Sequence, residues 1–201
     1  MIKRLFDVVL AAAGLIISFP LWLLIAAAIK AEDGGPLFYG QERVGRGGRI
    51  FRAYKFRSMI PDAEEGRGPV QAAYDDPRAT RVGRILRATA LDELPQLWSI
   101  LVGDMSFVGP RALRPREIEV DGEGKAVPLE SIPGYQERLR VRPGLTGIAQ
   151  VYAPRNLPRR HKFRYDLLYI RKQSFWLDLK LILASFWITA RGKWESEEDK
   201  L

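Results

Sequence analysis

The sequence predicts an α+β fold that is mostly helical, with a hydrophobic N-terminal helix, a short β-hairpin and amphipathic helices around one domain. Three observations support this fold class. Residues 8–29 contain no charge, two short runs of β-forming residues flank a glycine-rich turn, and several stretches carry apolar residues at helical spacing. At 201 residues the chain is long enough to bury a sizeable core. We therefore expect a membrane anchor at residues 1–32 and one domain at residues 33–201.

The charge balance of the chain indicates an anionic partner. Lys and Arg number 32 against 24 Asp and Glu, so the formal net charge is +8 at pH 7. Nucleic acid, an acidic membrane surface and phosphorylated small molecules all fit such a balance. Cysteine is absent, which excludes disulfides, thiolate metal sites and cysteine nucleophiles.

The uncharged segment 8–29 is long enough for a helix that crosses a bilayer, and longer than the roughly 7 to 15 apolar residues typical of signal peptides. Basic residues lie on both sides of it, which favours keeping both ends in the cytoplasm. Pro20 interrupts the helical hydrogen bonds near the middle, and Ser18 can bond a carbonyl freed there. A kinked spanning helix and a helix that enters and returns both remain open from these residues.

The next part of the chain predicts a hairpin, a loop and a helix. Residues 37–59 contain two β-forming runs around "GRGG", which is typical of a hairpin. The polar residues 61–80 predict a surface loop. Residues 81–87 have apolar side chains on one helical face and predict a helix.

The stretch "ATALDELPQLWSI" places two adjacent carboxylates, Asp92 and Glu93, in an apolar run. The leucine spacing predicts a helix that begins close to Asp92, with Pro95 in its first turn. Simple capping is one explanation, because Thr89 and Asp92 match a capping pattern and acidic residues there contribute a few tenths to about 1 kcal/mol. Capping does not explain why two carboxylates stand together in a basic chain.

The C-terminal half predicts a loop followed by two helices. Residues 114–140 are rich in turn formers, with a short helix around 135–140, and residues 141–151 predict a tight turn that feeds a strand or extended segment. Residues 161–172 and 175–190 have helical periodicity. The second of these helices fits a membrane interface and a buried core equally well. The tail after Arg191 is expected to be solvated.

Seven segments, in order along nearly the whole chain, resemble the small monotopic phosphoglycosyl transferases, also called bacterial sugar transferases. These segments are "KRLFDVVL", "QERVG", "YKFRSM", "LDELPQL", "GDMSFVGPR", "RPGLTGIAQV" and "KFRYDLLYIRKQSFWLDLKL". Two departures stand out. Phe19 separates Ser18 from Pro20, where the family often has Ser next to Pro, and Ala112 follows Pro110-Arg111, where the family commonly has a second Pro.

The resemblance implies a reaction and a location. The chain is expected to transfer a phosphosugar from a UDP-sugar to a polyprenol phosphate and to release UMP, as the first membrane step of glycan assembly. It implies a re-entrant anchor helix and a catalytic domain on the cytoplasmic face of the bacterial plasma membrane. Asp92 corresponds to the nucleophile of a double displacement, Glu93 to a neighbour that places metal or handles a proton, and Mg²⁺ is required.

Cationic side chains in or beside the matched motifs are candidates to bind phosphate, because negative oxygens must be neutralised before an anion attacks them. They are Lys55, Arg57, Arg87, Arg111 and Arg142, and each could instead be a surface charge. Thr146 and Gln150 are candidates to contact nucleotide or sugar. Asp166 could join Asp92 and Glu93 at the metal, orient an arginine, or form an ordinary salt bridge on its own helix.

The expected partners are therefore a UDP-sugar, a polyprenol phosphate and membrane lipids, with no nucleic acid, and a homodimer stays open. Two rival hypotheses carry no catalysis. One is a membrane-tethered basic module that binds nucleic acid, in which the acidic pair only caps a helix. The other is a single-pass membrane scaffold.

Overall fold

The computed structural model describes residues 2–61, 63, 76–120, 125–154, 156–192 and 194, and its architecture is α+β and mostly helical, as predicted. The α-helices are α1 (Ile2–Asp33), α2 (Arg81–Ala88), α3 (Gln96–Val102), α4 (Tyr135–Arg138), α5 (Ile148–Tyr152), α6 (Arg159–Lys172) and α7 (Phe175–Ala190). The strands are β1 (Phe38–Val44), β2 (Ile50–Phe56), β3 (Ser106–Val108), β4 (Ile118–Val120), β5 (Ala126–Pro128) and β6 (Gly144–Thr146). Short 3-10 turns are η1 (Arg46–Gly48), η2 (Leu91–Glu93) and η3 (Leu129–Ser131).

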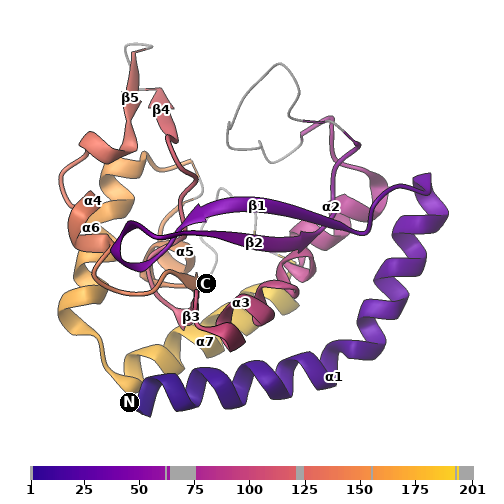
Figure 1. Cartoon of the computed structure of the whole chain (residues 1–201), viewed down its shortest axis with the longest axis horizontal. Helices are drawn as coiled ribbons and strands as arrows, with labels where there is room; N and C mark the ends of the chain where they lie inside the picture. Colours follow the sequence, from indigo (N-terminus) through magenta and orange to yellow (C-terminus); the bar gives the residue numbers. More distant parts are fainter. Residues whose placement is uncertain are drawn as a thin grey trace.

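Helix α1 runs along one side of the molecule and bends about midway, so that its second half rises beside α2 (Figure 1). Pro20 lies inside it, and the 32 residues would measure about 48 Å if straight. Ser18 accepts a hydrogen bond from Trp22 Nε1 at 3.0 Å, which is a different partner from the freed carbonyl that the sequence suggested. Among the described residues, α1 is the one helix long and apolar enough to cross a membrane, and little of its apolar stretch is buried.

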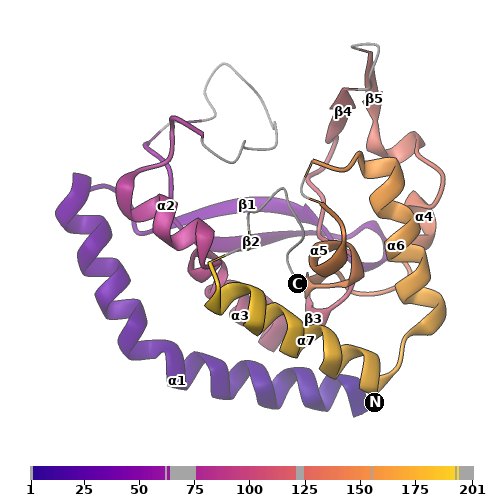
Figure 2. The same cartoon turned by 180° about the vertical axis from the view of Figure 1, so that it is seen from behind.

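The predicted hairpin is confirmed. Strands β1 and β2 pair antiparallel with Phe38 opposite Phe56 and Val44 opposite Ile50. Gly47 at the turn adopts a left-handed conformation, with φ 69°, which glycine reaches without steric cost. The hairpin crosses the middle of the molecule above α3 and α7 (Figures 1 and 2).

The main core lies between the hairpin, α1, α3 and α7. Ala11, Phe51, Ile100, Met105 and Leu181 are among its buried members. Strands β3 and β6 pair in parallel with Ser106 opposite Gly144, and Phe107 and Val108 of β3 belong to this core. Strand β6 (Gly144–Thr146) confirms the prediction of a turn that feeds a strand within residues 141–151, whereas β3, the small β4–β5 hairpin and α5 were not predicted.

The acidic pair does not begin an α-helix, which corrects the prediction. Asp92 and Glu93 lie in the 3-10 turn η2, and α3 begins only at Gln96 with Pro95 as its N-cap residue. Pro95 has no N–H to continue a hydrogen-bonded helix from the preceding turn, so the two elements stay separate. The proposed Thr89 cap is also wrong, because the Thr89 hydroxyl donates to Ile85 O, 2.8 Å away, at the end of α2.

The predicted helices at residues 81–87, 161–172 and 175–190 are confirmed as α2, α6 and α7, and the short helix near 135–140 as α4. Helix α7 combines both of its expected environments, because it buries Leu181 and Ile188 and exposes Leu183, Phe186 and Trp187. The surface loop at 61–80 and the tail lie mostly outside the described residues. Trp194 of the tail packs against the core, so this residue is not solvated as predicted.

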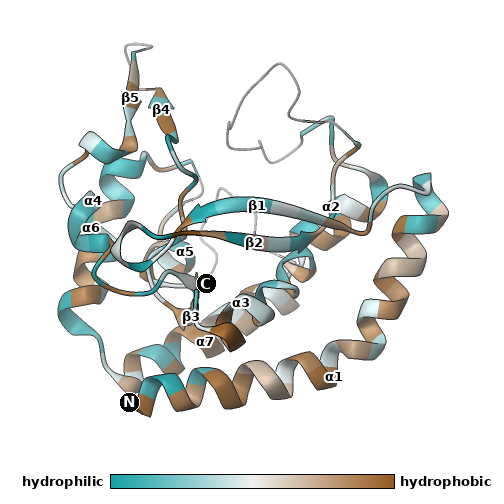
Figure 3. Ribbon diagram, viewed as in Figure 1, coloured by the Kyte–Doolittle hydropathy of each residue, from teal (hydrophilic) through white to brown (hydrophobic). Residues whose placement is uncertain are grey.

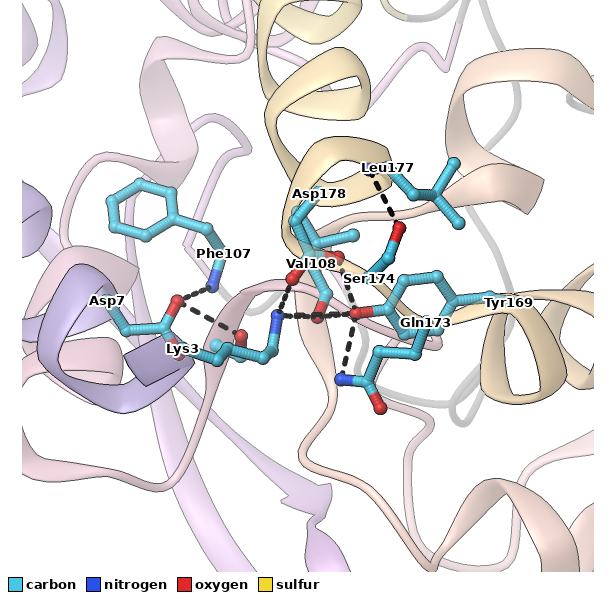
Figure 4. A network of polar contacts seen from close by, with 10 residues as sticks. Lys3, Asp7, Phe107, Val108, Tyr169, Gln173, Ser174, Leu177 and Asp178 are labelled. Carbon is cyan, nitrogen blue, oxygen red and sulfur yellow. Dashed lines mark hydrogen bonds and ion pairs between the residues drawn. The ribbon is translucent and has the colours of Figure 1, made fainter. Parts of the chain in front are cut away.

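The first turns of α1 are fixed to the domain by a buried polar network (Figure 4). Lys3 Nζ donates to Asp178 Oδ2 at 2.5 Å and to Val108 O at 3.1 Å, and Tyr169 donates to Asp178 Oδ1 at 2.8 Å. Asp7 Oδ1 accepts from the amide of Phe107 at 3.1 Å. These contacts join α1 to β3, α6 and α7.

The other end of α1 is fixed to the same domain. Glu32 accepts hydrogen bonds from the amides of Arg81, at 2.6 Å, and Val82, at 3.1 Å, at the start of α2. Asp33 forms an ion pair with the buried Arg57, which follows β2. Hydrophobic colouring covers most of the length between these two polar ends (Figure 3).

Candidate active site

The acidic pair lies buried beside the end of β2, with about 6% of Asp92 and 7% of Glu93 exposed. The residue before the turn, Ala90, has φ 53° and ψ 17°, a left-handed conformation that costs an L-residue roughly 1–2 kcal/mol. Strained backbone of this kind persists only where the surrounding packing enforces it. The left-handed Ala90 changes the direction of the chain after α2, and the two carboxylates that follow it are buried.

Three leucines fix this turn from the apolar side. Leu91 and Leu94 pack in the cluster formed by α1, β2 and α2, and Leu97 is buried in the main core. The apolar residues that made the acidic pair look misplaced in the sequence therefore hold its backbone in place.

A substitution pair at this turn tests the strain. Ala90→Gly is expected to raise the free energy of unfolding by about 0.5 kcal/mol. Glycine removes the cost of the left-handed conformation in the folded state, but the greater conformational entropy of glycine in the unfolded chain cancels part of this gain. Ala88→Gly, two residues earlier in α2, is the matched control and is expected to lower it by about 1 kcal/mol. Thermal unfolding in detergent measures both, and a fall in stability for Ala90→Gly would contradict the strain.

Positive side chains surround the pair. Lys55 on β2 forms an ion pair with Glu93 Oε1, and its Nζ lies 3.6 Å from Asp92 Oδ2. Arg111 Nη2 lies 3.7 Å from Glu93 Oε1. Lys55 reaches the carboxylates because Phe56, the next residue along the strand, points to the opposite face and is buried in the core.

The electrostatics keep Glu93 ionised. Burial raises the pKa of the Glu93 carboxyl, but the positive charges of Lys55 and Arg111 outweigh it, so the pKa lies below its usual value. At neutral pH, Glu93 therefore carries a negative charge and holds no proton to donate. Of the two roles that the resemblance implied for it, placing a cation suits this state better.

Arg43, which the sequence analysis did not single out, belongs to this site. Burial and the nearby Arg111 and Arg114 lower its pKa to about 10, and its charge in turn contributes to lowering the pKa of Glu93. Its signal in the sequence was its position in the matched segment "QERVG", on the same strand face as Gln41, whose side chain accepts a hydrogen bond from it.

Two other predicted phosphate ligands lie beside the site in different environments. Arg87 is buried in the last turn of α2, just before the acidic pair. After the hydrogen bonds from Arg78, its charge is a further cause of the low pKa of Asp76, about 2. Arg57 is buried and paired with Asp33 at the end of α1.

The remaining candidates have contacts elsewhere. Arg142 donates to Gly103 O at 2.8 Å, at the C-terminal end of α3, whereas the acidic pair precedes its N-terminal end. Thr146 shares a hydrogen bond with Ser185 of α7. Gln150 is buried in α5, and its Oε1 lies 2.9 Å from the position that a Cβ on Gly147 would take. None of these contacts is with the acidic pair.

Asp166 does not join the acidic pair. Its Oδ2 accepts a hydrogen bond from Arg138 Nε at 2.7 Å, and both side chains are buried. Burial raises the pKa of the Asp166 carboxyl, against the opposing charge of Arg138. Among the residues that the structure describes, no group of three or more His, Asp or Glu side chains could hold a metal ion. Of the roles predicted for Asp166, orienting an arginine is the one that its contact with Arg138 fits.

The donor set at the pair still suits magnesium. Mg²⁺ is commonly bound through one or two carboxylates and completes its coordination with water and substrate phosphates. Asp92 and Glu93 supply two adjacent carboxylates of this kind. A site that is completed by a bound diphosphate fits these residues better than a cage built from the protein alone.

Comparison with known proteins agrees with the family resemblance of the sequence. A family model described as bacterial sugar transferase matches residues 1–192. A UDP-glucose:undecaprenyl-phosphate glucose-1-phosphate transferase of Caulobacter vibrioides is 45% identical over 186 residues, which are 90% of this chain and 67% of that protein. The exopolysaccharide production protein PSS of Rhizobium leguminosarum is 37% identical, over 92% of both chains.

Several relatives are much longer. A UDP-glucose:undecaprenyl-phosphate glucose-1-phosphate transferase of Klebsiella pneumoniae is 41% identical over 185 residues, which are 90% of this chain and 38% of that protein. The chain therefore spans well under half the length of such relatives.

Proposed function

Because the chain belongs to the bacterial sugar transferase family, we propose that it transfers a phosphosugar from a UDP-sugar to a polyprenol phosphate. The products are UMP and a polyprenol diphosphate sugar, and the step initiates glycan assembly. The names of its relatives support undecaprenyl phosphate as the lipid and a UDP-sugar as the donor.

The observation that carries this proposal is the buried acidic pair with Lys55 and Arg111 within ion-pair distance. A carboxylate that attacks a diphosphate is repelled by the phosphate oxygens, so cations must be in place beforehand. Lys55 pairs with both carboxylates and its side chain is more exposed than theirs, 23% against 9%. Arg111 offers a planar fork that fits phosphate oxygens.

The proposed reaction has two displacements. First, an Asp92 carboxylate oxygen attacks the phosphorus that carries the sugar, the bond from this phosphorus to the bridging oxygen breaks, and UMP leaves with that oxygen. Then a phosphate oxygen of the polyprenol phosphate attacks the same phosphorus, and the bond to Asp92 breaks. One site thus serves a soluble and a lipid substrate in turn.

Magnesium is part of this proposal. Asp92 and Glu93 are the residues that would hold it, together with phosphate oxygens of the donor. When bound, it would neutralise charge on the diphosphate and stabilise the departing UMP. The chain's own cations supply the remaining neutralisation, and the ionised Glu93 keeps Lys55 in position.

The test is UMP release. Protein held in nanodiscs with undecaprenyl phosphate is expected to release UMP from at least one member of a panel of UDP-sugars. EDTA is expected to abolish the release and added Mg²⁺ to restore it. No release from any UDP-sugar would overturn the proposed function, and release that EDTA does not change would overturn only the magnesium requirement.

We also propose that α1 enters and leaves the same leaflet, at the cytoplasmic face of the bacterial plasma membrane. The support is that Lys3 and Asp33, at its two ends, both bind the same domain. A straight spanning helix would put these ends on opposite sides of the bilayer, about 30 Å apart or more. Helices α1, α3 and α7 run along the lower side of Figures 1 and 2, and their exposed apolar side chains would lie at the interface.

This topology predicts a labelling result. Because the chain has no cysteine, Ile2→Cys and Ala31→Cys each introduce one thiol near an end of α1. In sealed inverted vesicles, a membrane-impermeant maleimide is expected to label both variants. In intact spheroplasts it is expected to label neither, and labelling of one position from each side would exclude the re-entrant helix.

The rival hypotheses make different predictions. A basic module that binds nucleic acid would lose affinity steeply with salt and would keep its binding in Asp92→Asn. A scaffold would release no UMP with any donor. If the wild-type protein releases no UMP, salt-sensitive binding of nucleic acid that persists in Asp92→Asn would favour the nucleic-acid module. The absence of such binding would favour the scaffold.

A further inference from the structure

The segment that carries Arg111 is held through its backbone carbonyl groups. In residues 110–113, four consecutive carbonyl groups each accept a hydrogen bond from outside the segment. The donors are the amides of Gly144 and Val44 and the guanidinium groups of Arg138 and Arg43. These donors come from three elements, β1, α4 and β6, so the segment is fixed from several directions.

Arg138 divides its guanidinium between two partners. Its Nε donates to Asp166 at 2.7 Å, and its Nη2 donates to the carbonyl of Arg111, also at 2.7 Å. Its Cζ also lies over the ring of Phe163, 4.3 Å from the ring centroid. Asp166 therefore sets the direction in which Arg138 reaches the segment, and Phe163 limits its rotation.

Arg43 acts on the next peptide. Its Nη1 donates to the carbonyl of Ala112 at 2.9 Å, and its Nη2 is held by Gln41. Ala112 has no ring to fix its backbone, unlike the proline common at this place in the family that the sequence resembles. Hydrogen bonds from the buried Arg138 and the partly buried Arg43 instead hold the carbonyls of Arg111 and Ala112.

We propose that Arg138, oriented by Asp166, and Arg43 are positioning residues that hold Arg111 against the acidic pair. The inference rests on the proposed function, because Arg111 is the member of this group that would contact the donor phosphate. Arg138 and Arg43 act through the carbonyls of Arg111 and Ala112 and do not contact the substrate.

The arrangement of the charges supports a geometric role. The pair of Arg138 and Asp166 is buried on both sides, and removing such charges from water offsets most of their attraction. The pair therefore contributes little net stability compared with apolar residues of the same size. What it does supply is a fixed direction for one N–H group toward Arg111.

A double-mutant cycle tests this coupling. Arg138→Gln is expected to lower kcat/KM for the UDP-sugar by about 10²-fold, the scale of a misplacement near 1 Å. In an Arg111→Ala background the same substitution is expected to add less than about twofold, because its effect passes through Arg111. A full additional 10²-fold loss in that background would overturn the proposal.

Arg138→Lys separates geometry from charge. Lysine keeps the positive charge beside Asp166 but lacks the planar fork that reaches both partners. It is expected to remain at least tenfold impaired, and full activity in this variant would overturn the geometric role. Where Arg138→Gln fails to fold because Asp166 is left buried without a cation, the double variant Arg138→Gln/Asp166→Asn and the separate variant Arg43→Gln carry the same cycle.

Arg4 is the matched control. It also donates to two backbone carbonyls, those of Ile100 at 2.5 Å and Leu101 at 2.7 Å, but in α3. The effect of Arg4→Gln is expected to be the same with and without Arg111→Ala. Coupling of Arg4 to Arg111 as strong as that of Arg138 would show a general loss of stability and overturn the proposal.

Hydrogen–deuterium exchange separates this inference from the proposed function, because it needs no substrate. The peptide that covers residues 106–114 is expected to exchange at least tenfold faster in Arg138→Gln and unchanged in Arg4→Gln. Unchanged exchange in Arg138→Gln would overturn the positioning role even in an active enzyme. Faster exchange in Arg138→Gln, combined with a wild-type protein that releases no UMP, would support the positioning of Arg111 and reject the transferase activity.

Discussion

Asp92→Asn is expected to lower UMP release by at least about 10³-fold while the protein keeps its fold, because an amide cannot replace the attacking carboxylate. Asparagine has nearly the same shape, so the packing of the turn around Leu91 and Leu94 is retained. Wild-type protein given a UDP-sugar without lipid acceptor is expected to gain the mass of one phosphosugar on a peptide that contains Asp92. Intact-protein and peptide mass spectrometry measure this gain.

Asp104→Asn is the matched control for this change. Asp104 follows the other end of α3, where its carboxylate forms a partly exposed ion pair with Arg49 at 3.9 Å. The control is expected to keep at least half of the wild-type rate. Retained activity in Asp92→Asn would reject Asp92 as the nucleophile. A phosphosugar found on another residue would assign the nucleophile to that residue.

Lys3→Met is expected to lower the free energy of unfolding by about 3 kcal/mol, because it leaves Asp178 buried without its cation. Asp178 would keep the hydrogen bond from Tyr169 but lose the ammonium group 2.5 Å away. Because Lys3 also donates to the carbonyl of Val108, the first turn of α1 would lose its attachment to β3. Chemical denaturation in detergent measures the loss.

The double variant Lys3→Met/Asp178→Asn distinguishes a buried charge from a general packing defect. It removes the second charge and keeps an acceptor for Tyr169, so it is expected to recover at least half of the lost stability. Lys3→Met with wild-type stability would show that the network in Figure 4 contributes little to the attachment of α1.

Local patterns in the sequence predicted the elements that form from contacts between residues close in the sequence. The hairpin followed from β-forming runs around glycines, and α6 and α7 followed from apolar periodicity. The grouping of Asp92 and Glu93 with Lys55 and Arg111 was predicted from the family resemblance, because all four residues lie in motifs that match the family. The acidic pair itself was visible as two charges in an apolar run.

Other features depend on contacts between distant parts of the chain. Strand β3 has three residues and exists only because β6, about 40 residues later, pairs with it in parallel. The partners of Asp166 and Arg142 lie on distant parts of the chain, so the local sequence pattern around these residues gave no sign of them. The 3-10 turn at the acidic pair was read as α-helix because leucine spacing does not distinguish the two over so few residues.

The hydrogen bonds to the four carbonyls of residues 110–113 also decide when the backbone of this segment loses its conformational entropy. Fixing the backbone of one residue costs roughly 1–2 kcal/mol of conformational entropy. For this segment that loss occurs once, when the chain folds, and is not repeated each time a donor binds. Only the side chain of Arg111, about a third of which is exposed, still has rotamers to restrict. The site would therefore meet each new diphosphate with its backbone already in the reacting arrangement.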